Sequence, residues 1–455
     1  MFRRVAIIGG GAAAATLLCE LLQRTPSQPL HLDWYTGVDA PARGVAYGSR
    51  STRHLLNVRA ASMSMFTSQP SGFLDFVQRD DPSVAGSDFL PRCRYGDYLE
   101  AEVTRALAQA KAKGYDVNIV PFAVDGVVPE RDSVTVIHGE ESRRADAVVL
   151  ALGSMPTQPL RGVSAAALAS GSYVVDPWSL LRAPERELAP RKVVLIGLGM
   201  TAVDVLLELS ARWPQAQFIG ISRHGLLPEA HRQAAAAPTG DGAELIESMH
   251  ETPEIRHWLR LLREAIAQES DWRTILDGLR PHTTGLWREL DATQRARFLR
   301  HARWAWERAR HRMPPQVAES IAALEESGRL TRRRGRMQSV ELAGDVLNLA
   351  LEAAHGDGAQ TLQADLIIQT TGMNADARRS THPLVRQLVT NGHVQPDVLG
   401  LGLQSDRDGR LMHAGNAWPQ LFAIGNLLRG TFWESTAMPE IRQQARHLAD
   451  QLLAS

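Results

Sequence analysis

Two glycine-rich turns, far apart in the chain, constrain its fold more than any other feature of the sequence. The first turn, residues 9–11, follows the apolar residues 5–8, and the second, residues 197–199, follows the apolar residues 193–196. Each turn then opens into a segment with the apolar periodicity of a helix. Glycine permits a tight turn and a close approach of the backbone to a pyrophosphate, whose charge the helix N-terminus stabilises. The pattern therefore predicts an α/β fold with two dinucleotide-binding units.

Later apolar segments supply the remaining strands of these units. Residues 147–154 and 365–372 both read as a buried strand that ends in a turn of small residues, and residues 421–426 form a last strand before a C-terminal helix. A last strand so far along the chain predicts that the first unit is discontinuous. We therefore expect two Rossmann-like domains, the first formed by residues 1–185 plus 370–455 and the second by residues 186–369.

A helical insertion is predicted within the second domain, at about residues 231–329. It holds half of the ten tryptophans, at positions 258, 272, 287, 304 and 306. A doubly wound domain needs no such segment, so we expect a lid or a module on the substrate side. The alternative is that these tryptophans only pack the helices against one another.

Charge and cysteine content exclude several classes of function. The 50 basic and 50 acidic residues cancel, so no global charge favours nucleic acid or a membrane surface. Cys19 and Cys93, the only cysteines, form no CxxC pair, which argues against a flavin disulfide reductase. No run approaches the roughly 18 apolar residues of a membrane span, and no cluster has the spacing of a metal site. We expect a cytoplasmic protein without metal, nucleic-acid or membrane partners.

Four further segments distinguish the chain from a generic dinucleotide-binding protein. They are residues 44–47 (GVAY), 54–58 (HLLNV), 222–228 (SRHGLLP) and 430–442 (GTFWESTAMPEIR). With the glycine turns, they resemble a bacterial FAD/NAD(P)-binding family among the flavin-containing and N-hydroxylating monooxygenases. The resemblance implies FAD in the first domain and NADPH, or NADH, in the second. It also implies an enzyme that hydroxylates a small substrate with molecular oxygen through a C4a-hydroperoxyflavin.

The resemblance also suggests which residues hold FAD. Gly9, Gly11 and Ala14 would cradle its pyrophosphate. Asn57 would face the isoalloxazine and donate a hydrogen bond during catalysis, although it also suits a cap or a turn. The other predicted FAD contacts are Met63, Arg92, Tyr98, Val124, Gly153, Gly425, Asn426, Thr436 and Met438.

The acidic residue that usually binds the adenosine ribose is missing from its expected place. That place, at the end of the second strand, falls near Thr36. A threonine cannot bridge two ribose hydroxyls as a carboxylate does. Asp33 and Asp39 are the nearest acids, and neither lies at the expected position.

The second glycine turn is assigned to the nicotinamide cofactor through Gly197, Gly199, Thr201 and Ala202. Its second strand ends at Ser222 and Arg223, again without an acid. An arginine there suits a ribose 2′-phosphate, which favours NADPH over NADH. The alternative is a solvated loop charge.

The substrate is assigned to the insertion, where arginines lie beside aromatic residues. Such a surface suits a planar anion, and the first expectation is the oxidation of urate to 5-hydroxyisourate in purine catabolism. Two alternatives are an N-hydroxylase of natural-product biosynthesis and a flavin reductase or redox-binding protein without an oxygenase step. The alternative for the arginines is that they form solvated helix faces. The residues that suggest this site are Arg280, His282, Trp287, Arg300, His301, Arg310 and His311.

Overall fold

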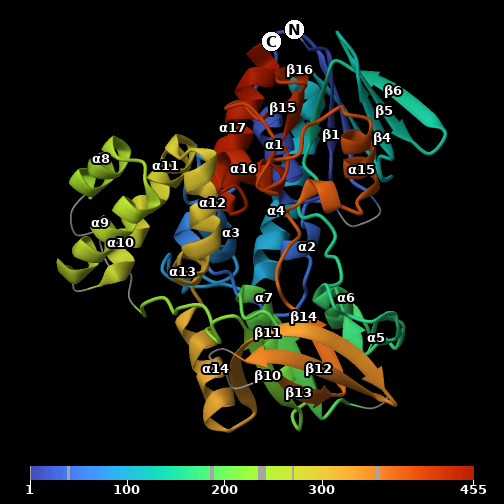
Figure 1. The fold of residues 1–455 in the computed structure, drawn as a ribbon. Helices are drawn as coiled ribbons and strands as arrows, with labels where there is room; N and C mark the ends of the chain where they lie inside the picture. Colours follow the sequence, from blue (N-terminus) through green and yellow to red (C-terminus); the bar gives the residue numbers. More distant parts are fainter. Residues whose placement is uncertain are drawn as a thin grey trace.

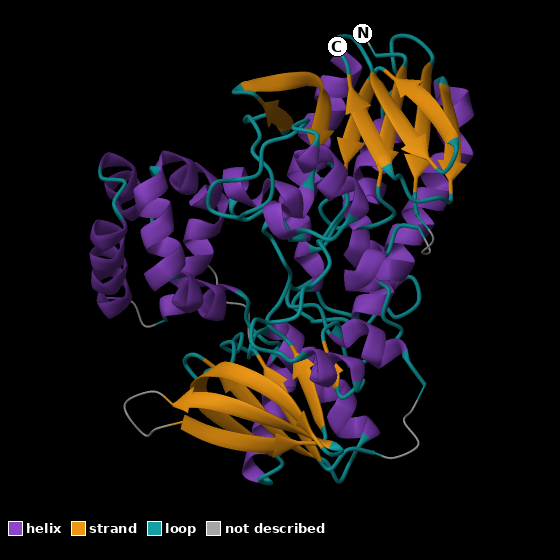
Figure 2. Cartoon of the chain, turned by 45° about the vertical axis from the view of Figure 1, so that its right-hand side comes forward, coloured by secondary structure: helices purple, strands orange, loops and turns teal. Residues whose placement is uncertain are grey.

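Two sheets with parallel centres, one near each end of the molecule, organise the chain (Figure 1). The computed structural model describes residues 2–37, 41–184, 189–233, 242–268, 271–353 and 359–454. Helices cover both sheets, and a group of helices projects to one side, at the left of Figures 1 and 2. The predicted fold class, two Rossmann-like units with a helical insertion, is confirmed.

The first sheet combines both ends of the chain. Its central strands are Val-, Ile- and Ala-rich and buried on both faces, as expected for parallel strands beneath helices. The strand order is β15 (Arg410–His413), β16 (Asn416–Ala423), β7 (Ala147–Leu150), β1 (Arg4–Ile8), β2 (Leu30–Tyr35) and β3 (Tyr115–Val120), with only β15 antiparallel.

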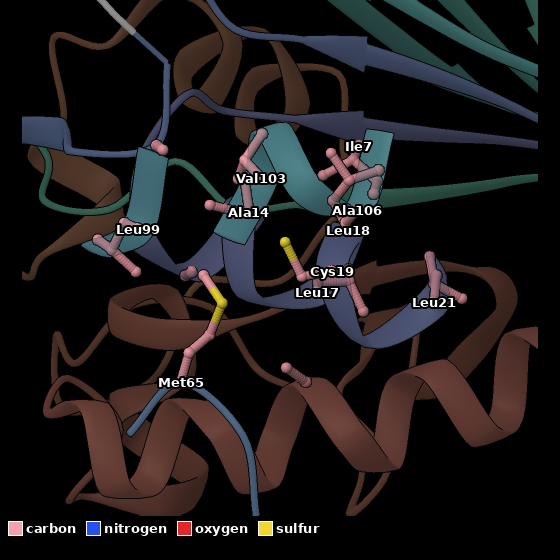
Figure 3. Close-up of a cluster of buried hydrophobic side chains, with 14 of the residues drawn as sticks. Ile7, Ala14, Leu17, Leu18, Cys19, Leu21, Met65, Leu99, Val103 and Ala106 are labelled. Carbon is pink, nitrogen blue, oxygen red and sulfur yellow. The ribbon is translucent and has the colours of Figure 1, made fainter. Parts of the chain in front are cut away.

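Three helices cover one face of this sheet, and a small antiparallel sheet with one helix covers the other. The apolar face of α1 packs in one core with α4, α17 and the strands, through Leu17, Leu18 and Leu21 (Figure 3). Cys19, a free cysteine, lies fully buried in the same core. The covering elements are α1 (Ala12–Gln23), α4 (Arg92–Ala110) and α17 (Met438–Ala454), opposite β4 (Gly126–Pro129), β5 (Val134–His138), β6 (Glu141–Ala145) and α15 (Pro383–Thr390). Short helices α2 (Gly44–Tyr47) and α3 (Gly72–Gln78) lie in the loops before α4.

The second sheet holds the second glycine turn. Helices α6, α7 and α14 cover one face of its parallel part, and its antiparallel strands fold over the other face with α5. The strand order is β13 (Ala359–Ala364), β12 (Val346–Ala353), β11 (Leu330–Ala343), β10 (Gln217–Ser222), β9 (Lys192–Ile196), β14 (Leu366–Gln369) and β8 (Tyr173–Val174). The helices are α5 (Ala165–Ala169), α6 (Pro177–Arg182), α7 (Met200–Arg212) and α14 (Pro315–Glu326).

The insertion between β10 and α14 has a core of its own. Its helices pack around Trp258, Trp287, Leu276 and Leu286, and Trp433 of the C-terminal region joins them. The elements are α8 (Ala243–Glu251), α9 (Ile255–Gln268), α10 (Trp272–Leu279), α11 (Thr283–Glu289), α12 (Ala292–His301) and α13 (Arg303–Arg310). Helix α14, which lies within the predicted insertion, packs on the second sheet instead because Val317 and Ile321 face α7.

The two connections between the sheets run side by side. Met155, which follows β7, forms an antiparallel bridge with Asn374, which follows β14. The carboxyl ends of β7 in the first sheet and β14 in the second therefore point toward each other. The glycine turns after β1 and β9, the neighbouring strands, face the same region between the sheets. Ligands of open α/β sheets bind at this edge of the strands.

Candidate cofactor and active site

The first glycine turn is held close to the neighbouring backbone. Gly9 has a φ of +131°, and a Cβ on it would lie 2.2 Å from the carbonyl oxygen of Ala151. Gly11 caps α1, and no side chain among the described residues caps that helix N-terminus. Ala14 is fully buried against the sheet. The α1 N–H groups thus remain available to an anion, and the binding of a pyrophosphate by them stays a prediction.

The C-terminal segment contributes buried polar groups without partners to the same place. Gly425 lies over the start of α1, and its N–H donates to Gln444 Oε1 (3.0 Å). Both amide atoms of the neighbouring Asn426 are buried without a hydrogen-bond partner among the described residues, and so is Ser435 Oγ. Buried polar groups rarely stay unpaired. These atoms therefore fit a polar ligand such as the ribityl and phosphate groups of FAD.

In the structure, as in the sequence, no acidic residue directly follows β2, where the residue that binds the adenosine ribose usually lies. Thr36 directly follows β2, and its N–H donates to the carbonyl of Val120. Asp33 lies inside the strand, where Asn118 Nδ2 donates to its carboxylate (2.9 Å) and Arg143 lies 3.5 Å away. That carboxylate is therefore engaged in the protein. Asp39 lies outside the described residues.

Asn57 contacts His231, at the start of the predicted insertion. Its backbone carbonyl accepts a hydrogen bond from His231 Nε2 (3.1 Å), and His231 packs on the ring of Phe89. Burial, and then the charge of Arg312, lower the pKa of His231 to about 4. His231 is therefore neutral near pH 7 and keeps an N–H on Nε2 to hold the Asn57 segment.

This histidine makes stability depend on pH. Its pKa is lower in the folded chain than the 6.5 of a free histidine, so the unfolded chain binds the extra proton first. The free energy of unfolding should fall by about 1.4 kcal/mol per pH unit as the pH drops from 6.5 to about 4. Urea unfolding at pH 7, 5.5 and 4 measures this loss.

The His231→Gln variant retains a donor and should flatten the profile. His54 and His382, whose pKa values burial also lowers, contribute in the same direction, so some slope remains. The exposed His301, changed to Gln, is the matched control and should leave the profile unchanged. Equal slopes in wild type and His231→Gln would refute this role.

Three predicted flavin contacts are core residues. Met63, Tyr98 and Val124 are all less than 10% exposed. The hydroxyl of Tyr98 accepts from the N–H of Met65 (3.4 Å), and burial raises the pKa of Tyr98 to about 12. These side chains support the walls of the predicted site, and direct contact with FAD stays a prediction for each.

Arg92 bridges the two units. Its Nη1 lies 2.9 Å from Asp204 Oδ2 on α7, and its Nε donates to the carbonyl of Leu55 (3.1 Å). Asp204 is buried, which raises the pKa of its carboxyl despite the opposing charge of Arg92. The guanidinium predicted to contact FAD is thus an anchor between α4 and α7.

The remaining predicted residues of the first unit lie around the turn. Gly153 has a φ of +64°, and a Cβ on it would meet no atom within 4 Å. Thr436 is exposed just before α17, and Met438 is buried in its first turn. Gly153 and Thr436 thus have open space beside them, Met438 belongs to the core, and direct contact with FAD stays a prediction for all three.

The second glycine turn repeats the design of the first. Gly197 has a φ of +107°, and a Cβ on it would lie 2.6 Å from the carbonyl oxygen of Thr370. Gly199 caps α7 without help from a side chain, Thr201 lies in its first turn, and Ala202 is fully buried. Ser222 Oγ accepts from the N–H of Gly225 (2.9 Å) and shapes the loop after β10.

Two arginines meet beside this turn. Arg223 follows β10, and Arg334 stands opposite Ser222 on the parallel strand β11. Both are exposed, and burial followed by their two charges lowers the pKa of the intervening His224. His224 stacks on Trp304 of the insertion, with ring centroids 4.1 Å apart. Arg334 was not among the residues predicted from the sequence, although the run Arg332 to Arg334 at the start of the next strand indicates a basic site there.

A buried cluster of charges joins the insertion to the start of α17. Arg280 Nε donates to Glu440 Oε1 (2.9 Å), and Trp306 Nε1 donates to Glu434 Oε1 (3.1 Å). Arg310 Nη2 lies 3.7 Å from Glu434 Oε2, but neither this atom nor Arg310 Nε has a hydrogen-bond partner among the described residues. A buried guanidinium with unpaired N–H groups fits a ligand that carries acceptor oxygens.

The other residues predicted for the substrate site do not converge. His282, Arg300 and His301 are exposed, and Trp287 is buried in the insertion core, where its Nε1 donates to the carbonyl of Gly430. Burial lowers the pKa of His311, which lies beside Glu434. Only Arg280, Arg310 and His311 thus belong to the cluster at α17.

The described residues contain neither a candidate metal site nor a helix that could span a membrane. Among the described residues, no group of three or more His, Cys, Asp or Glu side chains is placed to hold a metal ion. In the same part of the chain, no helix is both long and apolar enough to cross a membrane.

Comparisons with known proteins show which proteins share this fold. Residues 6–155 match the profile of a family described as FAD-NAD(P)-binding. A comparison with curated protein sequences gave no match. Three solved structures share the fold over nearly the whole chain. They are the Kutzneria sp. 744 ornithine N-hydroxylase (15% identity, TM-score 0.63, covering 99% of each chain), the Pseudomonas aeruginosa ornithine hydroxylase (16%, 0.65, 100% of this chain and 99% of that one) and the Pseudomonas syringae L-lysine 6-monooxygenase (17%, 0.67, 99% of each).

At these identities the solved structures show a common fold. The Staphylococcus aureus bacillithiol disulfide reductase shares it too, at 11% identity and a TM-score of 0.56, so the fold alone does not separate oxygenases from reductases. The family description agrees with the cofactors predicted from the glycine turns. The N-terminal part of this chain thus carries an FAD-NAD(P)-binding sequence pattern, and the chain as a whole has the fold of the flavin-dependent hydroxylases.

Proposed function

We propose that this chain is an FAD-dependent monooxygenase that uses NADPH and oxygenates the nitrogen of a small amine. FAD would lie on the first glycine turn, where Gly9 and Gly11 leave room for its pyrophosphate and the α1 N–H groups would bind it. Asn426 and Ser435 would pair with its polar groups. Bound FAD would supply electron transfer from the nicotinamide and the activation of oxygen.

NADPH would lie on the second turn. Gly197 and Gly199 would receive its pyrophosphate, and Arg223 with Arg334 would bind the 2′-phosphate. The support is that these two exposed guanidinium groups lie on neighbouring parallel strands, Arg223 just after the end of β10 and Arg334 within β11, opposite that end. NADH would leave them without a phosphate partner.

The observation that carries an oxygenase is the insertion packed over the start of α17. Arg280, Trp306 and Thr284 bond across this contact to Glu440, Glu434 and the carbonyl of Phe432. A cover of this kind keeps water from a flavin that reacts with oxygen. A disulfide reductase needs a redox pair of thiols, and the buried Cys19 is far in sequence from Cys93.

The substrate class follows from the charge cluster. Arg280 is paired with Glu440, so the cluster does not present two open guanidinium groups to a planar anion such as urate. Arg310 retains N–H groups without a hydrogen-bond partner among the described residues, which suit the carboxylate of an amino acid, and three of the similar structures are enzymes named for ornithine or lysine. We therefore favour a small amine with a carboxylate over urate, for which neither the geometry nor the comparisons give support.

The test follows NADPH loss and oxygen use by the purified FAD-loaded protein. L-ornithine, L-lysine, cadaverine and urate are compared with no addition, and hydroxylamine products and hydrogen peroxide are both measured. We expect an amino acid to speed NADPH loss and to yield a hydroxylamine, with cadaverine, which lacks a carboxylate, a weaker substrate.

Two results would change the assignment. NADPH loss that no substrate affects, with all electrons recovered as hydrogen peroxide, would exclude the oxygenase. Stimulation by urate alone, with urate consumed, would restore the first expected substrate over the amine.

A further inference from the structure

The insertion holds a cavity that the proposed flavin chemistry does not use. It has a volume of about 400 Å³ and lies among helices α9 to α13. The cavity is partly open to the surface, because Ile266 and Ala305 of its lining are exposed. It falls in the range of small-molecule binding sites. Its aromatic wall is formed by Trp258, Trp272, Trp287, Trp304, Trp306 and Trp433.

Four of these six tryptophans use their polar edges within the protein. The Nε1 atoms of Trp258, Trp287 and Trp304 donate to the carbonyls of Met249, Gly430 and His301, at 2.8, 2.8 and 3.1 Å. Trp306 Nε1 donates to Glu434. Since these N–H groups are satisfied elsewhere, the indoles offer the cavity their carbon faces. Such walls suit an aromatic ring, which stacks or packs edge to face.

Three of the four charged or hydroxyl side chains of the lining are likewise satisfied, and the fourth, Arg263, is exposed to solvent. Arg308 Nη2 and Glu229 Oε1 pair with each other at 2.5 Å, so their charges cancel. Thr283 Oγ1 donates to the carbonyl of Leu279 (3.1 Å). A charged ligand would lose hydration in this cavity without gaining a partner from these groups. The lining therefore favours a neutral ligand.

The cavity and the proposed active site lie on opposite sides of α13. Ala305 and Ala309 face the cavity, whereas Arg310 of the same helix meets Glu434 beside α17. Trp306 belongs to both, because its ring lines the cavity and its Nε1 bonds to Glu434.

We propose that this cavity is a binding site for a neutral aromatic small molecule, separate from the flavin and nicotinamide sites. The inference goes beyond the proposed function, because binding here needs neither NADPH nor oxygen. A ligand in the cavity touches Trp306 and therefore perturbs the wall of the active site.

The experiment measures the binding of two probes to the purified FAD-loaded protein without NADPH. Indole and 2-naphthol are the neutral aromatic probes, and benzoate is the charged comparison. Isothermal titration and tryptophan fluorescence should both show saturable binding of a neutral probe, with benzoate at least tenfold weaker.

A matched pair of substitutions places the site. Ala305→Phe fills the cavity and should weaken binding of the neutral probe at least tenfold. Ala322→Phe, which enlarges an equally exposed alanine on α14, should bind like wild type. Flavin content and thermal unfolding show whether each variant is folded.

The outcomes are decisive in either direction. Saturable binding lost in Ala305→Phe and kept in Ala322→Phe supports the proposal. No saturable binding of either neutral probe to wild type, or equal binding by the folded Ala305→Phe protein, overturns it. Failure of the monooxygenase assay would not affect this result.

Discussion

The Arg223→Ala variant should have a KM for NADPH about 10- to 100-fold above wild type, with a KM for NADH within about twofold. The reason is that a charge-assisted hydrogen bond to the 2′-phosphate contributes about 1.5–3 kcal/mol, and NADH lacks this phosphate. Arg334, opposite the end of the same strand, should give an effect of the same sign when changed to alanine. Initial rates of NADPH and NADH oxidation measure both.

The control for this prediction is an exposed arginine far from the second glycine turn in sequence. Arg131→Ala removes an exposed arginine from the turn between β4 and β5, in the first unit, and should change neither KM. An equal rise in KM for both nucleotides in Arg223→Ala would mean that Arg223 positions the loop and does not read the phosphate.

The Gly197→Ala variant should reduce its flavin with NADPH at least about 100-fold more slowly than wild type while retaining FAD. A Cβ at this position would lie 2.6 Å from the Thr370 carbonyl oxygen, at a φ of +107°. The turn and the end of β14 must therefore move apart, which misplaces the pyrophosphate site by a fraction of an ångström or more. Flavin absorbance reports FAD content, and stopped-flow mixing reports the reduction.

The matched control is Gly328→Ala. Gly328 also has a positive φ, +70°, but a Cβ there would meet no atom within 4 Å. That change should cost about 1–2 kcal/mol of stability and leave the reduction rate unaltered. Reduction of Gly197→Ala at the wild-type rate would remove the second turn from the nicotinamide site.

The fold was predictable because its signals are local. An apolar strand, a glycine turn and an apolar-periodic helix follow one another directly, and both turns, β1 and β9, formed where this pattern placed them. The strands at residues 147–150 and 366–369 are likewise marked by buried apolar runs. The arrangement of elements far apart in sequence then follows from the rules of parallel sheets.

The site was less predictable because its side chains pair over long sequence distances. Arg92 forms an ion pair with Asp204, and Arg280 forms one with Glu440. No local sequence pattern predicts either partner. Arg334 was missed because the register of β10 with β11 is a property of the sheet. Asn426 was predicted from the resemblance, but only burial shows that its amide lacks a partner.

The tryptophans of the insertion pack its core and also line a cavity, while the role of the insertion as a lid or substrate-side module stays a prediction. Trp287 stacks on Trp433 with centroids 4.9 Å apart and so packs the core. The same ring lines the cavity. A helical pattern predicts that tryptophans are buried, but it does not predict the empty volume they leave.

The central claim is that one chain holds FAD and NADPH on its two glycine turns and passes electrons between them. Anaerobic mixing of the purified, FAD-loaded protein with NADPH tests it most directly. The account predicts that the oxidised flavin absorbance is lost with one NADPH consumed per flavin, and faster with NADPH than with NADH at equal low concentration. A protein that neither retains added FAD nor lets either nucleotide reduce it would contradict the account.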